Sequence, residues 1–151
     1  MDLEKIRKQI KSGRSIEDVL KKVDWKDFEK TVGEIFSQHN FKVKRNLRFK
    51  TKKRYEIDIF ASKRNFAICV DCKQWEQGRY KASAVKNSIK KQIERIEELK
   101  THMKEVIKIY PMIITLFDED IIKENNVFVV PVWKLNSFLL EIENVLQFFY
   151  T

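Results

Sequence analysis

Two short segments of the chain carry charged side chains at spacings that could do chemistry. Asp71 and Lys73 stand two residues apart in FAICVDCK, and Asp58 stands in RYEIDIFA shortly before it. Side chains alternate along a strand, so Asp71 and Lys73 point to one face if FAICVDCK is extended. Such a pair is either an ion pair at a strand end, worth little if exposed, or part of a site for a phosphate or a metal ion.

A hairpin between the two segments would bring Asp58 to the same place. Residues 62–65 are predicted to form a four-residue loop. That loop sets Asp58 opposite Cys69 and makes Asp71 its diagonal neighbour at roughly 7–8 Å. A loop one residue longer would put Asp58 and Asp71 on opposite faces, so a shared site makes a prediction about strand register.

A third carboxylate comes from a predicted helix over residues 25–39, whose apolar residues form one stripe. Glu29 falls inside the edge of that stripe, roughly 40° from Trp25, whereas Glu34 falls opposite, towards solvent. A carboxylate that faces a core is costly unless it is paired or bound to a metal. The plain alternative is a side chain that bends out to water or pairs with a lysine. The stripe consists of Trp25, Phe28, Val32, Ile35 and Phe36.

Three carboxylates that converge on one point cannot all stay ionised without a cation. Their hard oxygen atoms suit Mg²⁺, with Mn²⁺ as a substitute. A neighbouring lysine can orient an attacking water and neutralise charge on a phosphate. These are the parts that metal-assisted hydrolysis of a phosphodiester requires.

The elements that must position these residues follow from periodicity and caps. We expect an α/β domain with a mixed central β-sheet flanked by helices on both faces. The predicted helices are 2–12, a short one from the Ser15 N-cap to about Val23, 25–39 capped by Asp24, 82–104 and 134–149. The predicted strands are 41–49, 54–61, 66–72, 107–117 interrupted by Pro111, and 127–132, with a polar loop at 73–81.

The long helix over residues 82–104 places an amide in an apolar stripe. Gln92 falls among Val85, Ile89, Ile96, Leu99 and Met103, and a buried amide needs a partner. Gln92 either reaches the acidic site or bonds to backbone between helix and sheet. In the loop before this helix, Trp75, Arg79 and Tyr80 either border a substrate or, in the case of Trp75, cover the core. His39 and His102 show no partner in the sequence and are interpreted as surface residues, and residues 129–133 are expected in the core.

Composition bounds the class of protein. The 151 residues, 43% of them hydrophobic, fit one domain with one core. The charged opening segment indicates no secretory leader, and no apolar run is long enough to cross a bilayer, so we expect a cytoplasmic protein without membrane contact. Cys69 and Cys72 lie in an apolar strand and are interpreted as small hydrophobic residues rather than as a redox pair or half of a zinc site.

The net charge of +9 is concentrated in one stretch. Residues 42–54 hold eight basic residues and no acidic one, and the rest of the chain holds 23 basic against 22 acidic residues. Such a patch attracts a polyanion. The alternative is a solvated hairpin whose lysines protect an exposed sheet edge. The candidate DNA-binding residues are Lys44, Arg45, Arg48, Lys50, Lys52, Lys53 and Arg54, together with Arg79.

These motifs resemble a known family. Asp58 followed, after a hairpin, by Asp71-Cys72-Lys73 is similar to the motif of the PD-(D/E)xK, restriction-endonuclease-like nuclease superfamily, where glutamate is commoner at the position of Asp71. The segment WKDFEKTVGEIFSQHNFKV resembles the opening helix of that superfamily, and Glu29 matches its glutamate.

The nearest resemblance is to the Mrr-like and archaeal Holliday-junction-resolvase-like branches. It is carried by Phe28-Glu29, by Asp58-Ile59, and by Cys72-Lys73 followed by Trp75, and it covers about residues 24–135. It implies a restriction-endonuclease-like fold over the whole chain, with an N-terminal helical extension at 1–23, a nuclease core at 24–135 and a C-terminal helix at 136–151.

The resemblance also implies an activity, which is Mg²⁺-dependent cleavage of DNA, with branched or otherwise structured DNA as a candidate substrate. The metal would then be held by Glu29, Asp58, Asp71 and the Cys72 carbonyl. Lys73 would orient or deprotonate the attacking water. Gln92 matches a helical glutamine that reaches the active site in several branches. A homodimer would place two sites on one duplex, and the sequence leaves dimerisation open. The alternative is a non-catalytic nucleic-acid-binding module that keeps the fold, or an interaction domain whose basic hairpin meets protein or RNA.

Overall fold

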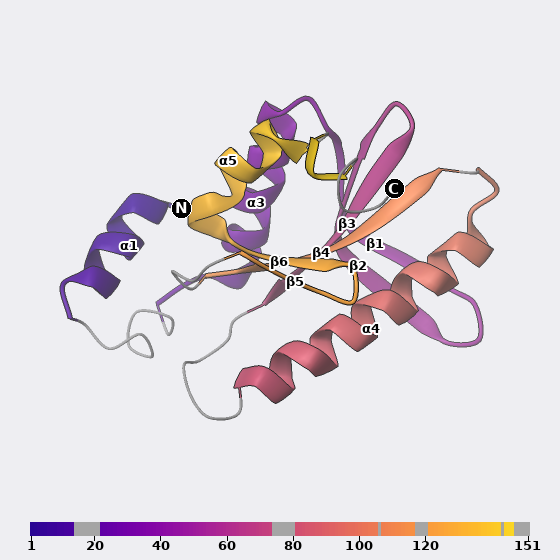
Figure 1. The fold of residues 1–151 in the computed structure, drawn as a ribbon, viewed down its shortest axis with the longest axis horizontal. Helices are drawn as coiled ribbons and strands as arrows, with labels where there is room; N and C mark the ends of the chain where they lie inside the picture. The colour runs from indigo at the N-terminus through magenta and orange to yellow at the C-terminus, as the bar shows by residue number, and fades with distance from the viewer. Residues whose placement is uncertain (14–21, 74–80, 106, 117–120, 143, 147–151) are drawn as a thin grey trace.

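The computed structural model describes residues 1–13, 22–73, 81–105, 107–116, 121–142 and 144–146, and Figure 1 shows the arrangement of its elements. The helices are α1 (Leu3–Lys11), α3 (Trp25–Gln38), α4 (Lys81–His102) and α5 (Val132–Leu140). The strands are β1 (Lys42–Lys50), β2 (Arg54–Lys63), β3 (Phe66–Lys73), β4 (Lys108–Thr115), β5 (Ile122–Glu124) and β6 (Val127–Pro131).

A single mixed sheet organises the molecule. Its six strands lie in the order β1-β2-β3-β4-β6-β5. The pairs β1–β2, β2–β3 and β5–β6 are antiparallel, whereas β3–β4 and β4–β6 are parallel. The parallel step from β3 to β4 needs a crossover connection, and α4 provides it. This architecture confirms the predicted α/β class with a mixed central sheet.

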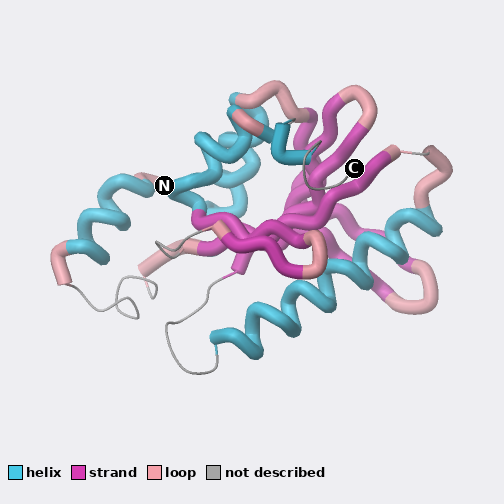
Figure 2. Tube along the Cα trace, viewed as in Figure 1, coloured by secondary structure: helices cyan, strands magenta, loops and turns pink. Residues whose placement is uncertain are grey.

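Helices cover both faces of the sheet. In Figures 1 and 2, α3 and α5 lie together on one side and α4 crosses the other. The apolar stripe of α3 is buried at Phe28, Val32 and Phe36, as its periodicity predicts. The predicted stripe of α4 is buried too, at Val85, Ile89, Ile96 and Leu99. None of the described helices has the length and apolarity that a bilayer crossing requires.

The start of α3 follows the predicted cap. The Asp24 carboxylate accepts hydrogen bonds from the backbone N–H groups of Lys26 and Asp27, at 3.0 and 3.4 Å. These bonds satisfy donors that have no partner within the helix. The cap fixes where the helix begins and therefore which face carries Glu29.

The hairpin between β2 and β3 differs from the prediction. Lys63 pairs with Phe66, so the loop contains only Arg64 and Asn65, not residues 62–65. Cys69 therefore lies opposite Phe60 rather than opposite Asp58. The register is shifted by two residues, an even number, so the shift itself moves no side chain to the other face.

Other differences are local. Pro111 lies inside β4 without interrupting it. The pairing of β4 with β6 begins one residue later, at Met112. The missing N–H of a proline is tolerated where a ladder is unpaired. The short strand β5 was not predicted. The helix predicted at 134–149 is interrupted: α5 ends at Leu140, residues 142 and 144–146 are helical again, and the last residues of the prediction lie outside the described residues. The helix predicted from Ser15 and most of the loop at 73–81 lie outside the described residues.

A twist in the β1–β2 ribbon changes which helix the ribbon faces. Ile59 packs in the core cluster that contains Phe28 of α3, whereas Ile57 packs in the cluster that contains Leu99 of α4. Residues two apart on a regular strand would share a face. Between them the ladder skips a pair: the register would set Asn46 of β1 opposite Asp58, and Asn46 takes a left-handed backbone with φ of 54°. Asp58 therefore sits where the ribbon turns from one helix layer to the other.

We expect the stability of the protein to depend on the left-handed backbone of Asn46. An Asn46→Val variant should lose about 1–3 kcal/mol of unfolding free energy, because a β-branched residue is strained at positive φ. Asn46→Gly, which tolerates this backbone, should stay within about 1 kcal/mol of the wild type. Urea denaturation measures both values, and equal stability of the two variants would contradict the assignment of the twist to this residue.

Candidate active site

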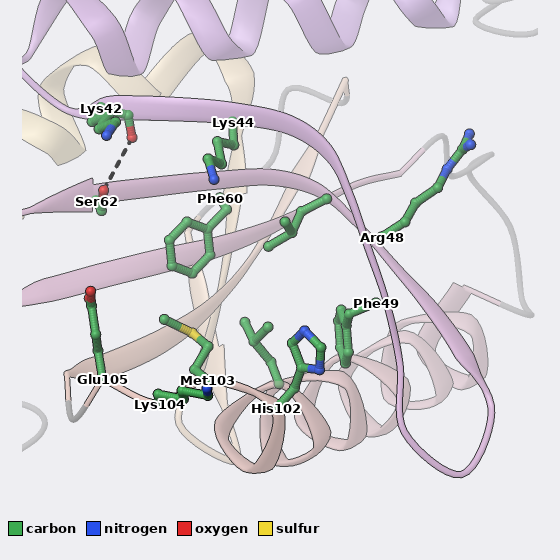
Figure 3. Close-up of a pocket in the computed structure, with 12 residues that line it drawn as sticks. Lys42, Lys44, Arg48, Phe49, Phe60, Ser62, His102, Met103, Lys104 and Glu105 are labelled. Atoms are coloured by element: carbon green, nitrogen blue, oxygen red, sulfur yellow. Dashed lines mark hydrogen bonds between the residues drawn. The ribbon is translucent and has the colours of Figure 1, made fainter.

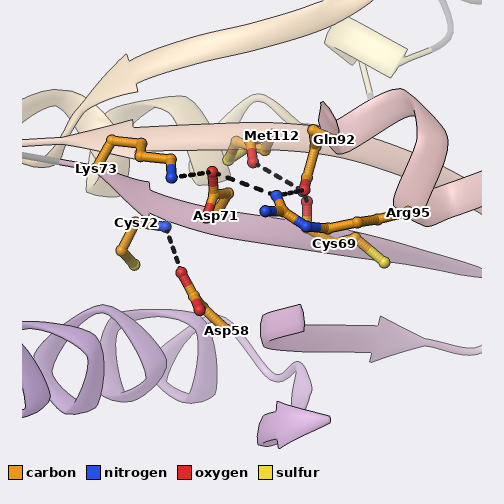
Figure 4. A network of polar contacts seen from close by, with 8 residues as sticks. All are labelled: Asp58, Cys69, Asp71, Cys72, Lys73, Gln92, Arg95 and Met112. Carbon is orange, nitrogen blue, oxygen red and sulfur yellow. Dashed lines mark hydrogen bonds and ion pairs between the residues drawn. The ribbon is translucent and has the colours of Figure 1, made fainter. Parts of the chain in front are cut away.

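The end of β3 carries an ion pair on the face covered by α4. Asp71 is 6% exposed, and its Oδ2 lies 3.3 Å from Nζ of Lys73. Figure 4 shows the two side chains on the same side of the strand. The alternation predicted for Asp71 and Lys73 therefore holds, and the pair is partly buried rather than solvated.

Asp58 reaches this point from β2. The last ladder pair of β2 and β3 on this side is Ile59 with Val70, and the register would set Asp58 opposite Asp71. Instead of continuing the ladder, the Asp58 carboxylate accepts a hydrogen bond of 2.9 Å from the backbone N–H of Cys72 (Figure 4). The side chain thus takes the place of a strand partner, and it holds the two carboxylates next to each other.

The proximity of the carboxylates disturbs the ionisation of Asp58. The pKa of Asp58 is raised to about 7, chiefly by burial. The hydrogen bond from the Cys72 N–H opposes the rise, whereas the charge and hydrogen bonding of Asp71 and the charge of Glu29 add to it. A buried carboxyl next to a second acid prefers to hold a proton unless a cation is present. The arrangement therefore has a deficit of positive charge.

The Glu29 carboxylate is close enough for the charge of Asp71 to affect its pKa, but it does not form a cluster with Asp58 and Asp71. Burial raises its pKa, the Arg45 guanidinium opposes that shift, and the charges of Glu56 and Asp71 add to it. Glu34 is exposed, as predicted. Within the parts of the chain that the structure describes, no three His, Cys, Asp or Glu side chains are grouped so as to hold a metal ion as they stand.

The oxygen atoms of the pair nevertheless fit a hard cation. Asp71 Oδ2 is buried and finds no hydrogen-bond partner among the described residues. Among the residues that the structure describes, Lys73 and Arg95 are its cationic neighbours at ion-pair distance. An oxygen with unused acceptor capacity beside a carboxyl with a raised pKa is what a site for a divalent ion requires before the ion binds.

Gln92 and Arg95 of α4 hold the other side of Asp71. The Gln92 amide donates to the carbonyl oxygens of Cys69, at 2.8 Å, and Met112, at 3.4 Å. Its Oε1 accepts from Arg95 Nη1 at 3.1 Å, and that nitrogen lies 3.5 Å from Asp71 Oδ2. Gln92 thus bonds to backbone between helix and sheet, one of its two predicted roles, and contacts the acidic site through Arg95. Arg95 is not among the residues predicted for the site, although it lies three residues after Gln92 on the same helix face.

The cysteines behave as predicted. Cys69 and Cys72 are free, and because they are three residues apart on β3 they face opposite sides of the sheet. Burial raises the pKa of Cys69 to about 12 and the pKa of Cys72 well above its usual range. Both thiols therefore stay protonated near neutral pH, and a neutral thiol packs like a small hydrophobic side chain.

The predicted DNA-binding residues separate into two groups. Two of them are bound to α4: Lys52 Nζ lies 3.2 Å from Glu98, and Lys53 Nζ lies 3.1 Å from Glu94. Hydrogen bonds from this tip, led by those of Lys53 and Thr51, lower the pKa values of the two glutamates. The exposed group consists of Lys44, Arg45, Lys50 and Arg54, with Arg48 in a long contact of 3.8 Å to Glu56. Arg79, Trp75 and Tyr80 lie outside the described residues.

The histidines lie at the surface as interpreted, with His102 exposed and His39 half-buried, and each has a contact that the sequence does not reveal. His39 Nε2 lies 2.6 Å from Asn136 Oδ1, and the His102 ring lies against Phe49 with centroids 5.5 Å apart. Both partners are distant in sequence, so no local pattern could indicate them.

The chain is similar to a known family and to two further proteins. The Mrr_cat family model, described as a restriction endonuclease, matches residues 20–115, a range that includes every carboxylate and lysine of the site. An uncharacterized protein of Archaeoglobus fulgidus is 29% identical over 116 residues, which cover 76% of this chain and 88% of that protein. A crystal structure of a protein of unknown function aligns over 77% of this chain with a TM-score of 0.48 and 16% identity, and the chain spans 65% of that solved protein's length.

The raised pKa of Asp58 predicts a pH-dependent stability in the absence of divalent ions. The folded protein keeps a proton to about pH 7 that the unfolded chain releases near its ordinary value of 3.8. The contribution of Asp58 is therefore full at low pH and is lost as the pH rises through about 7. In EDTA, Asp58→Asn should match the wild type near about pH 4 and exceed its urea midpoint near about pH 8. Parallel pH curves for the two proteins would contradict the assignment.

Proposed function

The chain belongs to the restriction endonuclease family, and we propose that it is a metal-dependent endonuclease that hydrolyses phosphodiester bonds of DNA at the Asp58–Asp71–Lys73 site. The observation that carries this proposal is the meeting of two carboxylates at the divergence of β2 and β3, with the Lys73 ammonium 3.3 Å from Asp71. Structured or branched DNA is the finer proposal for the substrate.

The residues have distinct roles in this proposal. Asp58, Asp71 and the Cys72 carbonyl would hold Mg²⁺, or Mn²⁺ in its place, and Glu29 would complete the set by turning towards them. The bound ion supplies a Lewis acid for the phosphoryl oxygen and lowers the pKa of a bound water. The positive charge of the ion would also offset the burial and the neighbouring negative charges that raise the pKa of Asp58.

Lys73 would act on the reacting groups directly. Its ammonium is held by Asp71 on a partly exposed part of the strand, with 32% of the side chain accessible. From there it can orient the attacking water or neutralise charge that develops on the phosphate. Arg95 and Gln92 act through Asp71: they fix the orientation of its carboxylate from the helix side.

The basic hairpin would contact the DNA backbone. The exposed cations Lys44, Arg48, Lys50 and Arg54 can bind phosphates without reading bases. Lys52 and Lys53 would contribute mainly by fixing the hairpin tip on α4, because each already has a glutamate partner. The phosphate contacts would therefore come from a surface held in place by ion pairs.

A cleavage assay tests the activity. The protein is incubated with labelled linear, nicked and four-way DNA in Mg²⁺, Mn²⁺ or EDTA. We expect metal-dependent cutting that Asp58→Ala and Lys73→Ala each reduce by about a hundredfold or more. Glu29→Gln should also reduce it, whereas Glu34→Gln, the same change on the solvent side of α3, should not. Intact DNA in every condition, with salt-sensitive binding retained, would identify a non-catalytic binding module.

Arg95 provides a separate test of how Asp71 is positioned. Arg95→Met should lower the single-turnover cleavage rate by about tenfold or more, because groups that orient a ligand carboxylate typically contribute that much. Arg95→Lys should recover part of the rate, since it restores a cation near Asp71. The affinity for DNA, measured in EDTA, should change little in either variant. Wild-type cleavage by Arg95→Met would remove Arg95 from the site.

A further inference from the structure

A groove of about 620 Å³ lies on the α4 face of the sheet, between the β1–β2 ribbon and the C-terminal end of α4. Figure 3 shows its lining. We propose that this groove binds a single-stranded segment of nucleic acid, with unpaired bases on its apolar floor and phosphates on its basic rim. The inference rests on the proposed function, because it names the kind of DNA that such an endonuclease would engage.

The floor is apolar and lies where the helix stops. Phe60 and Leu47 of the ribbon and Met103, just beyond the last residue of α4, are half-buried and line the groove. The rings of Phe49 and His102 lie together at one end of it, 5.5 Å apart. Because α4 ends at His102, no further helical turn covers Phe60, and flat apolar surface stays accessible beside water.

The rim is basic. Lys42 and Lys44 lie on β1 on one side and Lys104 lies on the other, while Arg48 lines the groove beside Phe49 with its guanidinium directed outward (Figure 3). Glu105 is the acidic residue in the lining. The contact of Arg48 with Glu56 is 3.8 Å long between side chains that are 78% and 45% exposed, so solvent screens it and the guanidinium can bind another anion. The charge of the rim is complementary to a phosphate chain.

The combination favours single strands over duplex. In a duplex the bases are stacked and paired, so only the basic rim would find a partner. An unpaired base offers a flat face that stacks on aromatic and other apolar side chains while its phosphates follow a positive groove. An acidic peptide could satisfy the rim, and it is therefore a competitor in the test.

The groove is close to the acidic site. Phe60 pairs with Cys69, and Cys69 stands two residues before Asp71 on the same face of β3, which corresponds to about 7 Å along the strand. Cys69 and Gln92 are buried between the groove and the acidic site under α4, so the two are neighbours in the fold but are not joined by an open path along β3.

Binding can be tested without cleavage. Fluorescence anisotropy in EDTA compares an end-labelled oligo(dT) of about 12 nucleotides with a duplex of equal length. We expect tighter binding of the single strand, weakened by about tenfold or more in Lys44→Glu/Arg48→Glu and by about fivefold or more in Phe60→Leu, which keeps an apolar side chain but removes the ring. Met103→Ala, at the helix end, provides a second change of the floor if Phe60→Leu unfolds.

The control is Lys5→Glu/Lys30→Glu, which makes the same charge change at exposed positions of α1 and α3, and it should bind like the wild type. The proposal is overturned if the floor variants bind oligo(dT) normally, if rim variants weaken duplex and single strand equally, or if poly-glutamate binds as tightly as oligo(dT). All binding is repeated in Asp58→Asn. Groove-dependent binding without any cleavage would contradict only the proposed endonuclease activity. Cleavage without groove-dependent binding would contradict only the proposal that the groove binds a single strand.

Discussion

The site depends on one hydrogen bond, from the backbone N–H of Cys72 to the carboxylate of Asp58. It forms where β2 and β3 stop pairing, and it brings a second buried carboxylate beside Asp71. Without this bond the Asp58 side chain would lie at an unpaired strand position with no reason to approach a like charge. Burial, and with it the charge of Asp71, raises the pKa of Asp58. The backbone thus stabilises a charge arrangement that side chains alone would oppose, and a cation would relieve it.

The long helix α4 connects the acidic site with the basic hairpin. Near its middle, Arg95 contacts Asp71, while Glu94 and Glu98 bind the lysines at the hairpin tip. These residues lie within four positions of one another, so the placement of the hairpin and the placement of Asp71 depend on the same helical turn. The number of basic residues in the hairpin sequence therefore exceeds the number free to bind a polyanion, because Lys52 and Lys53 are paired with glutamates of α4.

The sequence predicted the layers of this fold better than its contacts. The Asp24 cap, the α3 stripe and strand alternation depend on neighbours in the chain, and they correctly indicated that Glu29 lies inward and that Asp71 and Lys73 share a face. The hairpin loop was wrong by two residues because loops of two and four residues preserve the same alternation. Arg95, Lys52 and Lys53 have partners 24 to 46 positions away in the chain, and no local periodicity indicates those contacts.

Both borders of the sheet limit what can be added to it. At one border, β5 has only three residues. At the other, β1 pairs with β2 alone, and its outer N–H and C=O groups are interspersed with lysines and arginines. A second copy approaching that border would bring like charges together, which discourages fibre-like growth of the sheet. A bound polyanion, or salt that screens these cations, would weaken the repulsion between two copies. The resistance of the protein to aggregation and its binding of a polyanion therefore depend on the same few side chains.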